Sequence, residues 1–216
     1  MNIYLTTEKN LNVNLKQLCE VMNSMTKNIK FNYTTSVSDT IPSGFINYEL
    51  ELKKIKKLRK ETDSLFILIT NREYENNFFY ISEDNLAVIS FAHWEHYTTL
   101  PLENGIVFFI SQLICDNIIS SLSHAESRGC LSDYLENKAD VDRCMRMSYL
   151  CEDCMLEIRK VLRKDKTKNI VFEDLKIILN ALANTSRWDN SIFKVIGDNS
   201  IVNLILVQII LWVITI

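Results

Sequence analysis

Three closely spaced cysteines, Cys130, Cys151 and Cys154, constrain the fold of this chain more than any other feature. Cys151 and Cys154 form a CxxC pair, whose two thiolates can face the same ion. Zinc takes four such ligands in a tetrahedron, with sulfur about 2.3 Å away. Redox CxxC pairs normally lie near the start of a thioredoxin-like domain, whereas this pair lies far downstream beside other candidate ligands. The pattern therefore predicts a structural Zn²⁺ site in residues 124–154.

The fourth ligand has two candidates. His124 precedes Cys130, and Gly129 between them permits a tight turn. Cys144 competes, although a helix over residues 140–147 would make it a small buried apolar residue. Free core thiols are the alternative to zinc, and a zinc- or redox-responsive regulatory module is another use of the same thiols. The cysteines of the whole chain are Cys19, Cys115, Cys130, Cys144, Cys151 and Cys154.

The composition is that of a globular chain. With 216 residues and 47% hydrophobic content, the chain is long enough for one domain with a core. The opening MNIYLTTEKN has no basic and apolar runs of a secretory signal, so we expect a reducing, cytoplasmic compartment. Clustered cysteines there bind metal more often than they form disulfides. The net charge of −3 gives no reason to expect nucleic acid as a partner.

Strand and helix patterns alternate in the first half, which predicts an α/β domain with a mixed sheet. The apolar run LFILIT, residues 65–70, predicts a buried central strand. Other strands are predicted at 2–5, 29–35, 78–81 and 86–91, and helices at 15–25, 45–60, 103–123, 155–163 and 172–183. We place the domain at residues 1–184 and expect residues 185–200 to be a linker.

The chain ends in an uncharged apolar segment that runs from Ile201 to Ile216. A helix of this length rises about 24 Å, slightly less than a hydrocarbon core of about 30 Å. Two interpretations stay open. The segment either tethers the chain to the inner face of a membrane or forms a buried last helix or strand.

Residues 65–91, LFILITNREYENNFFYISEDNLAVISF, resemble the N-terminal half of the archaemetzincin family of zinc metallopeptidases. That family continues with HExxHxxGxxH, CxxxxCxM and, after a gap, CxxC. By spacing, His124 falls on the last histidine, Cys130 on the second cysteine, and Cys151 and Cys154 on the CxxC. The resemblance implies an α/β (α+β) fold with a metzincin-like mixed sheet, packed helices and a small zinc-stapled C-terminal lobe.

The departures from this family pattern concern its catalytic residues. The first two histidines fall on Ile114 and Ile118, and the catalytic glutamate falls on Cys115. Without these ligands and the general base, the resemblance implies a degenerate member with no catalytic residue. Ile114 and Ile118 are expected in the core. Ala125 stands where the family has its first cluster cysteine, and the neighbouring His124 is expected to replace it as a ligand.

The remaining histidines, His93 and His96, flank Glu95 and are interpreted as part of a surface loop. The favoured function is a catalytically inactive zinc-binding scaffold that acts through contacts with a protein partner. The alternative is a zinc-dependent hydrolase whose metal site is built from His93, His96 and His124. Asp116, Glu126 and Asp133 are expected either to orient His124 or, as is more common, to be ordinary solvated carboxylates.

Overall fold

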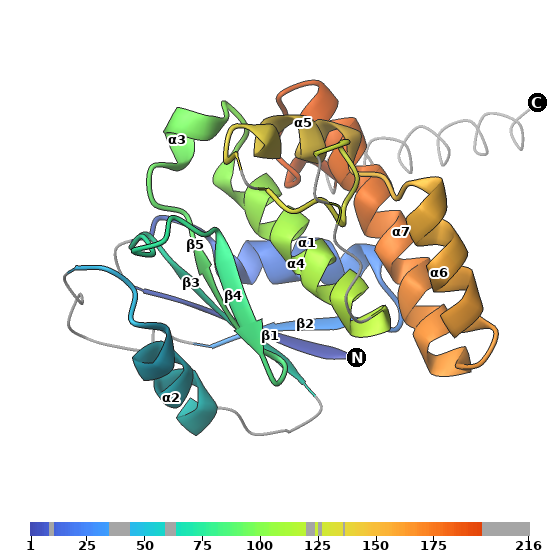
Figure 1. Ribbon diagram of the computed structural model, residues 1–216, viewed down its shortest axis with the longest axis horizontal. Coiled ribbons are helices and arrows are strands. Elements are labelled where there is room, and N and C mark those ends of the chain that lie inside the picture. The colour runs from blue at the N-terminus through green and yellow to red at the C-terminus, as the bar shows by residue number, and fades with distance from the viewer. Residues whose placement is uncertain are drawn as a thin grey trace, which may run out of the picture.

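Five strands form one mixed sheet in the order β2-β1-β3-β5-β4 (Figure 1). The computed structural model describes residues 1–8, 11–34, 44–58, 64–119, 124, 127–135 and 137–195. Four strands run parallel, and only β4 at the edge runs antiparallel to its neighbour β5. The strands are β1 (Asn2–Thr7), β2 (Lys30–Tyr33), β3 (Leu65–Thr70), β4 (Tyr80–Glu83) and β5 (Leu86–Ser90).

The sequence explains why β3 is central. All six of its residues are buried, as expected for a strand covered on both faces. Ile67 and Ile69 point into the larger core, whereas Phe66 and Leu68 point into a smaller core on the opposite face. The β4–β5 hairpin turns at Asp84 and Asn85, whose φ values of 51° and 61° are typical of a tight two-residue hairpin. The predicted buried strand at residues 65–70 is confirmed.

Helices cover both faces of this sheet, so the predicted α/β class is confirmed (Figure 1). Helix α2 packs on the smaller-core face, where Ile55 meets Phe66 and Val88. Helices α1 and α4 contribute to the larger core, and α7 packs along α4. The helices are α1 (Leu15–Met25), α2 (Tyr48–Leu58), α3 (Trp94–Tyr97), α4 (Leu102–Ile118), α5 (Asp140–Met147), α6 (Glu152–Leu162) and α7 (Lys166–Arg187).

Several boundaries differ from the sequence expectation. Helix α7 begins earlier than predicted because Asp165 caps it, accepting hydrogen bonds from the backbone N–H groups of Thr167 and Lys168. It also continues into the predicted linker. Beyond it, Ile192 is fully buried and its N–H donates to Asn104 Oδ1 at 2.8 Å. Residues 185–195 therefore belong to the packed domain.

Two further differences concern the edge of the sheet and the segment after β5. Strand β4 lies two residues later than the predicted strand at 78–81. The predicted loop at His93–His96 contains the short helix α3, whose Trp94 is buried and donates Nε1–H to the Leu100 carbonyl at 2.9 Å. The predicted membrane tether from Ile201 to Ile216 lies outside the described residues. No helix in the described part of the chain is long and apolar enough to cross a membrane.

Candidate metal centre

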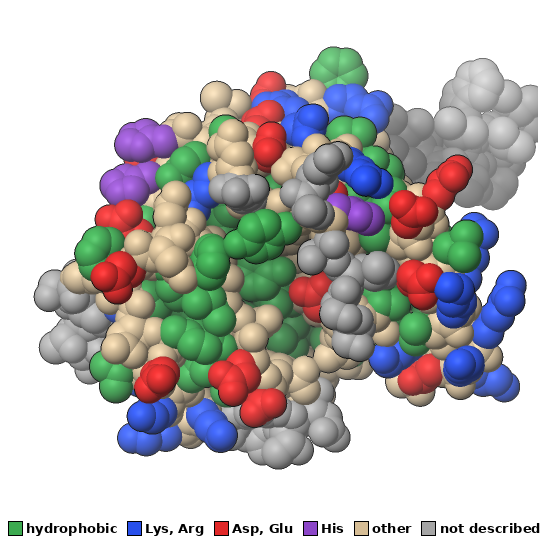
Figure 2. Space-filling view, viewed as in Figure 1, with side chains coloured by type: hydrophobic (Ala, Val, Ile, Leu, Met, Phe, Trp, Pro, Cys, Tyr) green, Lys and Arg blue, Asp and Glu red, His purple; other side chains and the backbone are tan. Residues whose placement is uncertain are grey.

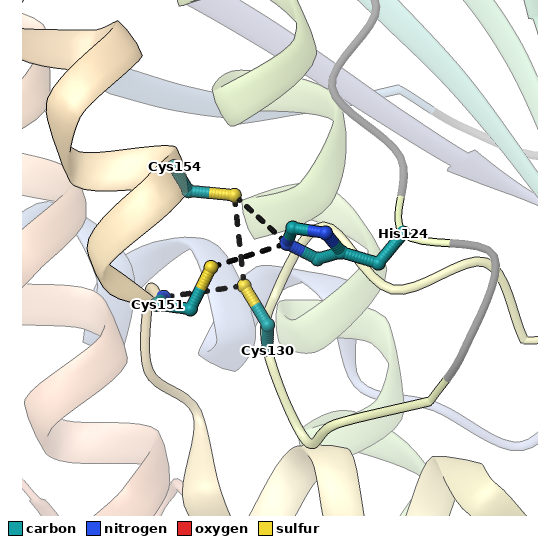
Figure 3. A group of neighbouring side chains, drawn as sticks. All are labelled: His124, Cys130, Cys151 and Cys154. Atoms are coloured by element: carbon teal, nitrogen blue, oxygen red, sulfur yellow. Dashed lines mark hydrogen bonds between the residues drawn. The ribbon is translucent and has the colours of Figure 1, made fainter.

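The side chains of His124, Cys130, Cys151 and Cys154 converge on one point between α6 and the segment that follows α4 (Figure 3). Their ligand atoms all lie within 4.8 Å of one another. Cys151 is the N-cap of α6 and Cys154 lies in the first turn of that helix. This placement turns both thiols of the CxxC pair toward the other two residues. The structure thus brings together the four residues that the sequence analysis nominated.

The distances in this group fit a tetrahedral zinc ion. Bonds of about 2.3 Å to sulfur and 2.0 Å to nitrogen would separate two sulfurs by about 3.8 Å, and sulfur from nitrogen by about 3.5 Å. The sulfurs of Cys130 and Cys154 lie 3.8 Å apart. Nε2 of His124 lies 3.1 Å from the Cys151 sulfur and 3.2 Å from the Cys154 sulfur. These three distances are within about 0.4 Å of the zinc values, and the other pairs of ligand atoms lie within 4.8 Å. Three thiols with one imidazole form a donor set of structural zinc sites.

Asp133 holds the turn that presents Cys130. Its Oδ2 accepts hydrogen bonds from the backbone N–H groups of Arg128, Gly129 and Cys130, at 2.5, 2.6 and 2.9 Å. Gly129 has φ of +87°, so the glycine is required there, as the sequence predicted for a tight turn. Asp133 does not bond the His124 ring. Both expectations for Asp133 are corrected: it is 4% exposed rather than solvated, and it organises the Cys130 turn rather than the His124 ring.

His124 is fixed through its backbone. Its N–H donates to the Ser132 carbonyl and its carbonyl accepts from the Tyr134 N–H, both at 3.1 Å. These two bonds form an isolated parallel bridge beside Asp133. The same loop joins the CxxC region, because the Leu131 N–H donates to the Tyr149 carbonyl at 2.7 Å. These backbone hydrogen bonds therefore hold the His124 imidazole and the Cys130 thiol close to each other.

Burial sets the protonation of these thiols. Desolvation raises the pKa of the Cys130 thiol and raises that of Cys154 strongly, so both thiols are neutral near pH 7 without a metal. Cys151 is the least buried of the three thiols. The Cys151 N–H donates to the Cys130 sulfur at 3.3 Å, an interaction that favours the thiolate. A metal ion would have to displace these protons, so its binding is linked to pH.

The alternative fourth ligand, Cys144, lies outside the group of four. Its thiol is fully buried in α5 and lies 3.8 Å from Asp133 Oδ2. Burial, with the nearby Asp133 carboxylate, raises the pKa of Cys144 to about 12. The prediction that a helical Cys144 would be a buried core residue is confirmed by its full burial.

The three histidines do not form one site. His124 belongs to the cysteine group, whereas His93 and His96 form a separate exposed group with Glu95. A relocated centre that uses all three histidines is therefore not assembled in this fold. The expected core positions are confirmed, since Ile114 is 0% and Ile118 is 2% exposed.

The side of α4 that faces the neighbouring cleft is different from the side that carries Ile114 and Ile118. Gln112 and Asp116, one turn apart, line a cleft between α4 and β4 together with Tyr80. The Gln112 Nε2 donates to the Leu131 carbonyl at 2.8 Å, which leaves its buried Oε1 without a hydrogen-bond donor in the described residues. Asp116, named from the sequence as a candidate partner of His124 or a solvated carboxylate, is exposed in this cleft and lies 3.4 Å from the Tyr80 hydroxyl. Gln112 was not singled out, because it is an isolated polar residue in a largely apolar helix. Glu126, the other carboxylate named with Asp116, lies outside the described residues.

Comparison with known proteins gives matches among solved structures only. No family model matches the chain, and no curated protein sequence matches it. A zinc-dependent peptidase from Methanocorpusculum labreanum (strain Z) is 15% identical with a TM-score of 0.48, over 72% of this chain and 99% of that one. Archaemetzincin from Archaeoglobus fulgidus is 19% identical with a TM-score of 0.43, over 73% of this chain and 99% of that one. The second bears the name of the family that the motif spacing resembles.

Proposed function

We propose that this chain is a zinc-binding scaffold without peptidase activity, and that it acts through contacts with a protein partner. His124, Cys130, Cys151 and Cys154 would hold one structural zinc ion. Four protein ligands leave no open position for water, which a hydrolytic zinc requires. Zinc bound here would contribute to folding stability by joining α6 to the Cys130 turn.

The proposed absence of peptidase chemistry rests on one observation. The α4 positions that align by spacing with the archaemetzincin catalytic motif are buried. Ile114 and Cys115 are 0% and 1% exposed, and Ile118 is 2% exposed. An HExxH site needs two imidazoles one helical turn apart and a carboxylate base. Here those places hold aliphatic side chains and a thiol whose pKa burial raises to about 12.

The cleft between α4 and β4 is the contact surface that we assign to the partner. Hydrophobic side chains gather over β4 and around the hollow beside it (Figure 2). The cleft has a volume of about 280 Å³, and its rim carries Phe78 and Tyr134, which are 38% and 49% exposed. Their rings meet edge to face, with centroids 6.4 Å apart. Exposed aromatic side chains are enriched at protein interfaces.

The chemistry of the cleft favours one kind of occupant. Gln112 Oε1 and Asp133 Oδ1 are buried and accept no hydrogen bond within the described part of the chain. An unsatisfied buried acceptor costs about 1–3 kcal/mol, so a donor that reaches it would bind favourably. The proposed occupant is a peptide segment of the partner that brings an apolar side chain together with a hydrogen-bond donor.

Two measurements test this function. Purified protein is expected to contain about one zinc per chain and to cleave no peptide library, and Cys151→Ser is expected to lose the zinc. Panning a random peptide library should then select peptides that bind the zinc-loaded chain and fail to bind a Phe78→Ser, Tyr134→Ser double variant. Peptide cleavage that a chelator abolishes would overturn the absence of catalysis. Selected peptides that bind the double variant equally well would overturn the cleft assignment.

The exposure of the Cys151 thiol supports a second candidate function. It is the most exposed thiol of the group, and an oxidant would reach it first. A zinc- or redox-responsive module would release its metal on mild oxidation and rebind it after reduction. Measuring zinc release against added peroxide separates this function from a permanently metal-bound scaffold.

A further inference from the structure

A second group of metal-ligating side chains lies far from the cysteines, on and beside α3. His93, Glu95 and His96 are all exposed, and their ligand atoms lie within 4.8 Å of one another. The two imidazoles stack with ring centroids 5.3 Å apart and planes 7° from parallel. Figure 2 shows two histidine side chains side by side on one end of the molecule, next to acidic side chains.

A fourth ligand candidate comes from another segment. Glu73, in the connection between β3 and β4, places its Oε2 3.7 Å from Nε2 of His93. Two carboxylates and two imidazoles therefore surround one patch of surface. Because the candidate ligands come from two separate segments of the chain, the group is more than two histidines that happen to share one helical turn.

The backbone that carries the histidines is well anchored although the side chains are exposed. Trp94 between them is 7% exposed, stacks edge to face on Phe91 and donates its Nε1–H to the Leu100 carbonyl. His93 itself has φ of 56°, in the left-handed region that non-glycine residues rarely adopt. Residues in such sparsely populated backbone regions are concentrated at active sites and ligand-binding sites.

The position in the fold also favours a ligand. His93 follows the carboxyl end of β5, and Glu73 follows the carboxyl end of the neighbouring β3. In sheets of parallel strands, ligands bind in the crevice outside the carboxyl ends. A pocket of about 400 Å³ opens there, lined in part by Asn71, Glu73, His93 and Glu95.

Two basic side chains, Arg72 and Lys138, lie near the proposed ligands and bear on the binding of a cation. Arg72 also lines the pocket, but its guanidinium contacts Glu8 at 2.6 Å and Glu51 at 2.8 Å. These buried ion pairs offset the positive charge of Arg72 and so weaken its repulsion of a cation in the pocket. Lys138 is 5% exposed, lies over the Phe79 and Tyr97 rings and is attracted to Glu73. Glu73 and Glu95 are the carboxylates that a bound cation would meet at the surface.

We infer that His93, His96, Glu95 and Glu73 form an exchangeable site for a divalent transition-metal ion. Imidazole nitrogens with carboxylate oxygens suit Zn²⁺, Ni²⁺, Co²⁺ and Cu²⁺. Adjacent ligands of an octahedral ion with bonds of about 2.1 Å lie about 3 Å apart, so the side chains must close from their present separation. Exposed side chains can make that adjustment by rotation. The remaining coordination positions face solvent and are open to water or to a ligand from a partner.

This site is independent of the cysteine site and can be tested separately. The experiment is a calorimetric titration of Ni²⁺ into the tag-free full chain that already holds its zinc, with zinc content measured before and after. We expect one Ni²⁺ to bind per chain, and His96→Ala to weaken this binding at least tenfold. His93→Asn is expected to do the same. Asn tolerates the left-handed backbone, so a loss of Ni²⁺ there reflects the imidazole rather than misfolding.

The matched control is Glu75→Gln, which removes a nearby exposed carboxylate outside the group and should leave Ni²⁺ binding unchanged. Glu73→Gln should weaken it several-fold. The inference is overturned if the zinc-loaded chain binds no Ni²⁺, or if His93→Asn and His96→Ala bind it as tightly as the parent. Loss of zinc in these variants would also overturn it, because the two sites would then be coupled. Failure of the cysteine site appears separately, as absence of zinc at the start.

Discussion

The structure contains a matched pair of carboxylates that allows the role of Asp133 to be measured. Asp133 Oδ2 accepts three backbone N–H bonds from the Cys130 turn, and Asp174 Oδ2 accepts three from residues 27–29. Both side chains are almost fully buried, at 4% and 2% exposure. Only Asp133 lies beside the proposed zinc ligands. Changing each to Asn removes the same kind of charge from two different places.

The expected cost follows from these contacts. A hydrogen bond to a charged acceptor contributes about 1.5–3 kcal/mol and a neutral one about 0.5–1.5 kcal/mol, so three weakened bonds cost about 3 kcal/mol. Burying the Asn amide costs less desolvation free energy than burying the Asp carboxylate, and this difference offsets about 1 kcal/mol of the loss. Each variant should therefore lose about 2 kcal/mol of unfolding free energy. For a fold of this size, the melting temperature should fall by about 4–8 °C.

The two variants should differ in zinc affinity. With the Cys130 turn loosened, part of the zinc-binding energy would be needed to order it, so Asp133→Asn should bind zinc about 10–30-fold more weakly. Asp174→Asn should bind zinc as the parent does. Competition with a chromophoric chelator measures the affinity, and thermal unfolding measures the stability. Equal zinc affinity in Asp133→Asn and the parent would refute the reasoning that Asp133 prepares Cys130 for the metal.

Three further predictions rest on individual contacts, and a fourth rests on the apolar end of the sequence. Gly129→Ala should destabilise the chain by more than 1 kcal/mol in chemical denaturation, because φ is +87° and the added Cβ would lie 2.4 Å from the Met147 sulfur. Since zinc displaces protons at least from Cys130 and Cys154, its apparent association constant in buffered titrations should rise at least about 100-fold per pH unit near neutrality; a flat profile would contradict this. Despite burial, backbone N–H donors lower the pKa of Asp174, so its stabilising effect, present above about pH 4, should be lost on acidification below that, and acid unfolding of Asp174→Asn should show a weaker pH dependence than the parent. Removing residues 201–216 should move the protein from membrane to soluble fractions if that segment is a tether, and identical fractionation would exclude the tether.

The sequence predicted those parts of the structure in which one pattern has one physical solution. LFILIT can only be a covered strand or a short buried helix segment, and its neighbours break helices. The CxxC spacing likewise limits both thiols to one side of a helix start, and His124 was the nearest available imidazole. These local rules identified β3 and the four residues of the metal group.

Other features depend on packing that no local pattern encodes. Helix α4 is apolar almost throughout, so its periodicity could not show that Ile114 faces the core while Gln112 faces a cleft. Asp133 looks like any loop carboxylate in the sequence, and its role appears only when three N–H groups turn toward it. Helix α3 is a single turn held by Trp94, whose Nε1–H donates to the carbonyl of Leu100 just beyond the helix, and one turn is too short to show a helical repeat in the sequence.

X-ray absorption at the zinc edge of the purified full chain tests the central claim most directly. The structure predicts three sulfur ligands at about 2.3 Å and one nitrogen ligand at about 2.0 Å, from three cysteines and His124. In His124→Ala the nitrogen ligand should disappear while the sulfur ligands remain. Four sulfur ligands in the parent would place Cys144 in the site instead of His124. A shell of nitrogen and oxygen only, or no bound zinc, would contradict the proposed metal centre.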